Sequence, residues 1–264
     1  MKLTVLGARG SMPVSGKDYL AYGGATSCYL IETEHEAIFL DAGSGIVKSP
    51  DVGTRRVSVF LSHPHLDHIL GLPFCPMLSQ KDRELSLYAL KFDGIGAKDH
   101  VNQVFSVPIW PLHLANYPSN LTFVDLEESG EKDFGEVKIS WTLGHHPGKC
   151  LVFKITDSKT SIVYATDYEH TEASDERLVS FAKDADVFIY DGQYEEDEYE
   201  TKKGFGHSTA PHGLKLFEES HAKKLLITHH DPFAKDDDLK LREESLRAKN
   251  ANVSFAKEGD VFTF

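Results

Sequence analysis

The chain has 264 residues, of which 41% are hydrophobic and 26% are charged, and its net charge is −13 at pH 7. This composition is typical of a globular protein with a sizeable core, and no apolar run is long enough for a transmembrane helix or shaped like a secretory signal. The acidic excess argues against binding long nucleic acid through its phosphates, but it is compatible with a small anionic substrate, because bound metal ions supply local positive charge.

Strands dominate the first half of the predicted element order. Runs rich in Val, Ile, Phe and Tyr are typical of strands. Such runs occupy residues 3–6, 27–33, 37–41, 57–62, 85–90 and 121–126. Segment 105–118 carries three prolines and is apolar without a period, so we expect an irregular surface loop there. That loop could line a substrate site or a subunit contact, but packing alone would explain it equally well.

The second half alternates strands with helices. The same kind of run predicts strands at 137–143, 150–156, 161–167, 187–191 and 225–229, with short strands near 253 and 261. Helical patterns occupy 174–184, with Ser174 as the expected N-cap, 211–220 and 236–249. The acidic run at 195–200 predicts a solvated loop. Because helices gather late, we expect one α/β (α+β) domain spanning 1–264, with two sheets and helices outside them.

Cysteine is sparse in this sequence. The three cysteines are widely spaced and form no CxxC pair: Cys28, Cys75 and Cys150. This spacing predicts three free thiols, and neither a disulfide framework nor a thiolate zinc site. Free thiols are typical of a reducing compartment, so we expect a cytoplasmic protein.

Histidine is the departure from average composition, because eight of the 14 histidines fall in four short clusters at 63–68, 145–146, 207 and 229–230. The predicted strand 57–62 runs into the sequence HPHLDH at 63–68. In an extended loop alternate residues face the same way, so His63 and His65 can hold one metal ion. Asp67 and His68 then turn toward an adjacent position that suits a second ion. Three histidines within six positions, beside an aspartate at a strand end, favour this interpretation over chance clustering.

A two-metal site needs further ligands, and three other predicted strands end in suitable residues. Strand 137–143 is followed by His145 and His146, strand 161–167 ends in Asp167, and strand 225–229 ends in the pair His229 and His230. A carboxylate has two oxygens, so Asp167 is well suited to bridge two cations. The residues alone leave open which member of each histidine pair is the ligand.

These motifs resemble those of a known family. HPHLDH resembles the HxHxDH signature of the metallo-β-lactamase superfamily, where a later His, an Asp and a terminal strand-end His recur in the same order. GHST at 206–209, followed by a helix and LLITHH, resembles the ribonuclease Z-type phosphodiesterase branch. The segments LGARGSMP, YGGATSCYLIE and FLDAGSGI are similar to those of small stand-alone cyclic-nucleotide phosphodiesterases of the anti-Pycsar type.

The resemblance implies a fold, a ligand set and an oligomeric state. The fold is an αβ/βα four-layer sandwich of two mixed sheets flanked by helices, and relatives are commonly homodimers. In the family, one histidine ligand usually stands just before Pro-Gly, which selects His146. Another directly follows the last of these strands, which selects His229. The implied ligands of one ion are His63, His65 and His146, and those of the second are Asp67, His68 and His229, with Asp167 bridging. Zinc is the favoured divalent ion and manganese the alternative.

The implied activity is hydrolysis of a small phosphodiester, with a 3′,5′-cyclic nucleotide as the preferred substrate. Two ions can lower the pKa of a bridging water to roughly 7 and clamp the phosphodiester oxygens. We expect Asp67 to orient the resulting hydroxide and His207 to protonate the leaving alkoxide. The alternative is that His207 has no chemical role and merely precedes a helix whose N-cap is Ser208 or Thr209.

Three other functions must be weighed. Ribonuclease Z-type trimming of tRNA 3′ ends is the nearest, but that family inserts a long basic arm between the ligands that match His146 and Asp167, and only residues 147–166 lie there. A β-lactamase or thioester hydrolase is less consistent with GHST and the late THH. A non-catalytic metal-binding sensor or scaffold is the third, and the complete ligand set argues against a decayed site.

Overall fold

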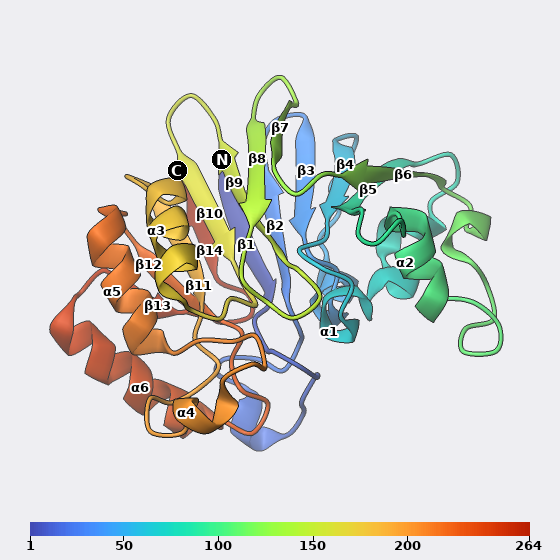
Figure 1. Ribbon diagram of the computed structural model, residues 1–264. Helices are drawn as coiled ribbons and strands as arrows, with labels where there is room; N and C mark the ends of the chain where they lie inside the picture. The colour runs from blue at the N-terminus through green and yellow to red at the C-terminus, as the bar shows by residue number, and fades with distance from the viewer.

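The computed structural model describes residues 1–264 as two seven-stranded sheets that face each other. In order across the first sheet the strands are β14 (Val261–Thr263), β1 (Lys2–Gly7), β2 (Cys28–Glu32), β3 (Glu36–Leu40), β4 (Arg56–Phe60), β5 (Glu84–Leu90) and β6 (Asn120–Leu126). In the second sheet they are β13 (Val253–Phe255), β12 (Leu225–Thr228), β11 (Val187–Asp191), β10 (Ser161–Ala165), β9 (Leu151–Thr156), β8 (Lys138–Leu143) and β7 (Gly130–Asp133). Figure 1 shows the two sheets and their helices.

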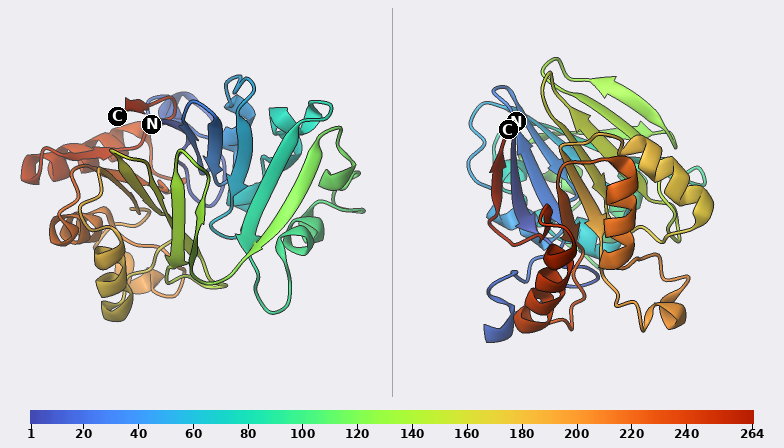
Figure 2. Two further views of the ribbon diagram at one scale, coloured as in Figure 1. Left: turned by 90° about the horizontal axis from the view of Figure 1, so that it is seen from above. Right: turned by 90° about the vertical axis from the view of Figure 1, so that its left-hand side faces the viewer.

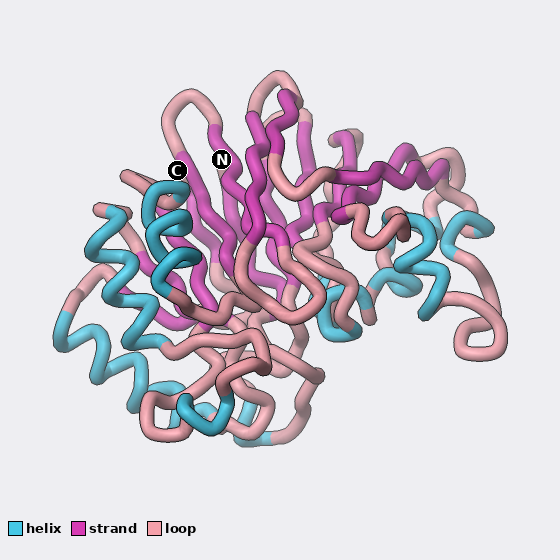
Figure 3. Tube along the Cα trace, viewed as in Figure 1, coloured by secondary structure: helices cyan, strands magenta, loops and turns pink.

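Both sheets are mixed. In the first sheet, β14, β1, β2 and β3 pair antiparallel and β3 to β6 pair parallel. In the second, β7 to β10 pair antiparallel and β10 to β13 pair parallel. Parallel neighbours end at the same edge of a sheet. The residues that follow β4, β10 and β12 therefore meet at one end of the sandwich, where the loops of Figure 3 gather.

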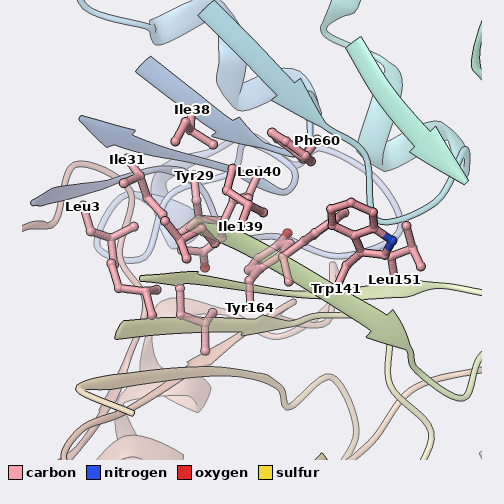
Figure 4. Packing of buried hydrophobic residues seen from close by; sticks show 14 of the residues in the cluster. Leu3, Tyr29, Ile31, Ile38, Leu40, Phe60, Ile139, Trp141, Leu151 and Tyr164 are labelled. Carbon is pink, nitrogen blue, oxygen red and sulfur yellow. The ribbon is translucent and has the colours of Figure 1, made fainter. Parts of the chain in front are cut away.

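The central core lies between the two sheets. Inward-facing side chains of both sheets form one buried cluster, shown in Figure 4, in which Phe60 stacks on Tyr88 with ring centroids 4.3 Å apart. Tyr29 and Tyr164 meet in the same cluster at 5.2 Å. Buried tyrosines need a partner for the hydroxyl. Tyr164 donates to Asp41 and Tyr29 to Thr228, so the core also supports the loops at the strand ends.

Helices cover the outer faces and complete four layers. The helices are α1 (Leu66–Ile69), α2 (Ala97–Val104), α3 (Glu172–Phe181), α4 (Tyr199–Lys202), α5 (Ala210–Ser220) and α6 (Asp236–Lys249). One buried cluster packs the first sheet against the α1–α2 region, and another packs the second sheet against α3, α5 and α6. Figure 2 shows α3, α5 and α6 outside the second sheet. No helix is both long and apolar enough to span a bilayer.

The predicted strands are all present, with ends within two residues of those expected, and the helices at 211–220 and 236–249 are confirmed. The N-cap prediction at Ser174 is wrong. The helix begins at Glu172 because Thr171 caps it: Thr171 Oγ1 accepts the N–H of Ser174, and Ser174 Oγ accepts the N–H of Thr171. Segment 105–118 is irregular, as expected, apart from a 3₁₀ turn at Leu114–Asn116.

The sequence patterns did not predict four elements, namely β7, α1, α2 and α4. Strand β7 is exposed at every position and lies at a sheet edge, so it lacks the apolar alternation that marks a strand. Helix α2 was not distinguished from the surrounding loop, and α1 lies inside the HPHLDH motif. The acidic run at 195–200 is also only partly a solvated loop, because Tyr199 is buried and begins α4.

Candidate metal centre

The HPHLDH segment changes conformation halfway along. Strand β4 ends at Phe60, the chain bends at Ser62, and His65 is extended where it precedes α1 as its N-cap residue. Asp67 and His68 lie on the helical turn of α1, which is the change of direction expected after His65. This change separates the two pairs of side chains. His65 is exposed to solvent, whereas His63, Asp67 and His68 are buried, so the site opens on the side of His65.

One group of candidate ligands consists of His63, His65, His146 and Asp167, whose ligand atoms all lie within 4.8 Å of one another. His63 Nε2 is 3.5 Å from Asp167 Oδ2. His146 Nε2 is 3.9 Å from the same oxygen and 3.2 Å from His65 Nδ1. Three imidazoles and a carboxylate oxygen form a donor set typical of a zinc-like ion.

The second group consists of Asp67, His68, Asp167 and His229, again with all ligand atoms within 4.8 Å. His68 Nε2 is 3.1 Å from Asp167 Oδ1 and 3.2 Å from Asp67 Oδ2. His229 Nε2 lies at the same two distances from these oxygens. Asp167 thus turns Oδ2 to the first group and Oδ1 to the second, which is how a bridging carboxylate would be placed.

The other ring nitrogens of these histidines are held by acceptors. His68 Nδ1 donates to Asp41 Oδ2 at 2.7 Å, His229 Nδ1 to Gln193 Oε1 at 2.8 Å, and His146 Nδ1 to the carbonyl of Gly206 at 2.7 Å. A proton fixed on Nδ1 leaves the Nε2 lone pair facing the group, as a metal ligand requires.

Two buried atoms at the centre have no hydrogen-bond partner, namely Nε2 of His63 and of His68, because the carboxylate oxygens close to them are not aligned for a hydrogen bond. A buried nitrogen without a partner is costly unless something else satisfies it. The two nitrogens belong to different groups and face the shared Asp167, so the residues present fit a divalent cation in each group. The metal-binding chemistry expected from the sequence is thus supported by the donor set, its orientation and these unsatisfied atoms.

The electrostatics differ between the two groups. Burial lowers the pKa of His63 and of His65, and that of His146 to about 4, so these rings are neutral at pH 7. Burial acts in the same direction on His229, but the carboxylates of Asp167 and Asp67 outweigh it and raise the pKa to about 9. Without metal, the second group therefore holds protons that a cation must displace.

His68 and its aspartates follow the same pattern. Burial opposes charge on His68, but Asp167, Asp67 and Asp41 together raise its pKa. Burial alone would raise the pKa of both Asp67 and Asp167, yet the neighbouring imidazoles lower it, so both carboxylates are ionised. The second group can therefore offer two carboxylates to a cation.

The structure separates the members of each adjacent histidine pair. His146 lies in the first group, whereas His145 donates from Nδ1 to the carbonyl of Glu169. His229 lies in the second group, whereas His230 donates from Nε2 to the carbonyl of Ala256. The geometry therefore brings together the members selected by the resemblance and leaves their neighbours outside.

The backbone at the strand ends is also unusual. Asp41, Asp167 and His229 each follow a strand and have φ values of 60°, 51° and 58°. Residues other than glycine adopt this left-handed region only at a cost, and such residues cluster at functional sites. The strand ends are thus bent to aim these side chains at the centre.

A sequence model described as the beta-lactamase superfamily domain matches residues 37–230. The chain belongs to the beta-lactamase superfamily. It is 27% identical to the probable metallo-hydrolase YhfI of Bacillus subtilis, over 99% of this chain and 99% of that protein. It is 21% identical to a ribonuclease Z of Natronomonas pharaonis, over 99% of this chain and 97% of that protein.

Two solved structures share the fold. The metallo-beta-lactamase fold protein YhfI of Bacillus subtilis matches with a TM-score of 0.75 at 22% identity, covering 99% of each chain. A diphosphatase of the PhnP family matches with a TM-score of 0.74 at 18% identity, covering 100% of this chain and 97% of the other. The fold expected from the HxHxDH resemblance is confirmed, and the chain is a metallo-hydrolase of the superfamily.

His207, the expected proton donor of this hydrolase, lies beside both groups. Its ring stacks on His229 with centroids 4.7 Å apart and meets His146 edge-on at 5.4 Å. Its Nδ1 donates to Asp191 Oδ2 at 2.8 Å. Thr209 caps the following helix by accepting the N–H of His212, as the alternative for His207 expected, but that role does not require the contacts of the His207 ring with Asp191, His146 and His229.

The ligand atoms of Asp191, His207, His229 and Asp167 form a third group within 4.8 Å. Asp191 is already occupied, because it also accepts the backbone N–H groups of Tyr168 and Gln193. It is therefore better suited to orient His207 than to bind a cation. Sequence reasoning missed Asp41 and Asp191, although both follow the signal that identified Asp167: an apolar strand that leads into an aspartate.

Proposed function

We propose that this protein is a binuclear metal-dependent phosphodiesterase. One divalent ion would be held by His63, His65 and His146, the second by Asp67, His68 and His229, and Asp167 would serve both. The observation that carries the proposal is the division of the Asp167 carboxylate, with one oxygen toward each group of ligands. Zinc suits the histidine-rich first group, and manganese is the alternative for the carboxylate-rich second group.

When bound, two such ions supply Lewis acidity and a water of lowered pKa, which suits attack on phosphorus. The side chains supply the rest. Asp67, held by the N–H of Ser11 at 2.8 Å, is placed to accept a proton and orient the attacking oxygen. Asp191 fixes the His207 proton on Nδ1, which leaves Nε2 to exchange a proton with the leaving oxygen.

A small substrate is favoured over a long one. The chain between His146 and Asp167 forms only the hairpin of β9 and β10, and the net charge of −13 gives no general attraction for a polyanion. Together with the resemblance to cyclic-nucleotide phosphodiesterases, these features favour a 3′,5′-cyclic nucleotide. The ribonuclease Z relatives favour a second candidate, a tRNA 3′ endonuclease.

A substrate panel tests the proposal. Metal-analysed protein is assayed on 3′,5′-cyclic mononucleotides, cyclic dinucleotides, precursor tRNA and bis(p-nitrophenyl) phosphate. Preferred cleavage of a cyclic mononucleotide is expected. Preferred cleavage of precursor tRNA would overturn the substrate and retain the mechanism. No hydrolysis of any of these with zinc, manganese or cobalt would favour a metal-binding scaffold.

Two further properties follow from the same resemblance and from the thiols. We infer a homodimer, which light scattering of the metal-loaded protein would test by giving twice the chain mass. We also infer a reducing, cytoplasmic compartment, because Cys28, Cys75 and Cys150 are all unpaired and buried. Fractionation of the native cells would contradict this if the protein were found in an oxidising compartment.

A further inference from the structure

Glu169 is a buried carboxylate that lies outside the ligand groups and has no role in the chemistry described above. Its side chain binds only backbone: Oε1 and Oε2 each lie 2.9 Å from the N–H of Gly204, and Oε2 also accepts the N–H of Gly206 at 2.8 Å. Glu169 is 8% exposed. A buried carboxylate accepting several N–H groups is a strong fixed contact, since hydrogen bonds to charged acceptors are the stronger ones.

The loop that Glu169 holds leads directly into the centre. The carbonyl of Gly206 accepts the Nδ1 proton of His146, and the next residue is His207. Gly204 and Gly206 have φ values of 89° and 93°, which turn their N–H groups toward one carboxylate. A Cβ on Gly206 would lie 2.0 Å from His146 Nδ1, so this backbone must approach the imidazole closely.

Glu169 also joins the two loops that carry His146 and Asp167. It follows Asp167 by two positions, its N–H donates to the carbonyl of His145, and its own carbonyl accepts from His145 Nδ1. One residue therefore links the loops that carry Asp167, His146 and His207.

We propose that Glu169 is a positioning residue that fixes the Gly206 carbonyl, and through it the orientation of His146 and the place of His207 beside the centre. This inference rests on the proposed function, because it assigns His146 to the first ion and His207 to proton transfer. It predicts that the charge and reach of the Glu169 side chain matter although the side chain touches neither substrate nor metal.

The substitution E169Q tests the proposal, because an amide keeps one acceptor oxygen and replaces the other by an NH2 group. The matched control is E200Q, since Glu200 is an exposed glutamate on α4 that pairs with Lys203. The readouts are amide hydrogen exchange at Gly204 and Gly206, the visible spectrum of the Co²⁺-loaded protein, and kcat and KM for bis(p-nitrophenyl) phosphate. Glu169→Asp, which keeps the charge but shortens the reach, is the conservative variant.

In E169Q, amide hydrogen exchange at Gly204 and Gly206 should be roughly 10- to 100-fold faster, because opening of this loop no longer breaks hydrogen bonds to a charged carboxylate. The Co²⁺ spectrum should change, and kcat should fall roughly 10- to 100-fold with KM little altered. Glu169→Asp should recover part of each effect, and E200Q should match the wild type.

Wild-type exchange and an unchanged Co²⁺ spectrum in E169Q would overturn the proposal. If E169Q fails to fold, amide hydrogen exchange of the wild-type protein tests the proposal by itself. Unprotected Gly204 and Gly206 amides would overturn the proposal, and slow exchange at both would support it. A wild-type protein that binds no cobalt would instead refute the proposed function, while the amide exchange would still report on the Glu169 contact.

Discussion

The sharpest prediction concerns Asp41, which lies outside the ligand groups and holds the ring of His68 in the second group by a hydrogen bond. Asp41 is fully buried, and Oδ2 accepts from His68 Nδ1 at 2.7 Å, from Tyr164 OH at 2.8 Å and from Ser62 Oγ at 2.9 Å. Oδ1 accepts the N–H of Ser62 at 2.7 Å. In Asp41→Asn the least costly arrangement keeps oxygen at the Oδ2 position, so the NH2 group faces the Ser62 N–H.

The loss of unfolding free energy in Asp41→Asn follows from that arrangement. Losing one charge-assisted hydrogen bond and leaving a buried N–H unpaired costs about 1.5–3 kcal/mol. For a chain of this size, that cost lowers the Tm of the metal-free protein by roughly 3–12 °C. The neutral amide also makes His68 a weaker ligand, so metal affinity at the second group should fall roughly 10- to 100-fold.

The assay combines thermal unfolding of the metal-free protein with a metal titration followed by elemental analysis. Asp51→Asn is the matched control, because exposed Asp51 accepts the N–H of Gly53 in a turn that asparagine also favours. Wild-type metal affinity in Asp41→Asn would refute the reasoning. A lowered Tm with unchanged affinity would show that Asp41 supports the fold but not the metal.

Three further predictions concern His207, His229 and the three cysteines. His207→Ala should lower turnover roughly 10²- to 10⁴-fold with metal content intact, and metal loss or unchanged turnover would contradict the proton-transfer role. The metal-free protein should lose up to about 3 kcal/mol of unfolding free energy between pH 6.5 and 9, because the raised pKa of His229, about 9, stabilises the fold only while the ring is protonated. Urea titrations at both pH values measure this, and equal stability would contradict the assigned shift. The metal-loaded protein should show the opposite order, since protons compete with the cation. Finally, Ellman's reagent should label no cysteine in the native protein and three after unfolding, because all three thiols are buried; rapid native labelling would contradict the packing.

Much of the fold and of the candidate site could be predicted from the sequence because the signals were local. The candidate ligands lie in the loops that follow apolar strands, as Asp167 follows β10 and His229 follows β12, and parallel strands bring such ends together. The extent of a single domain over 1–264 stays a prediction, as do the roles of the individual ligands.

The rest depends on contacts between distant segments. Nothing local marks Gln193 as the acceptor for His229, because the two meet only when β11 and β12 pair. Asp41 and Glu169 likewise act through groups far along the chain. The edge strand β7 is specified by backbone pairing with β8 and not by burial, so side-chain pattern could not reveal it.

The most direct test of the central claim is anomalous diffraction from crystals of the zinc-loaded protein. The account predicts two peaks, one among His63, His65 and His146 and one among Asp67, His68 and His229, with one Asp167 oxygen toward each. A single peak, no peak, or side chains turned away from these positions would contradict it.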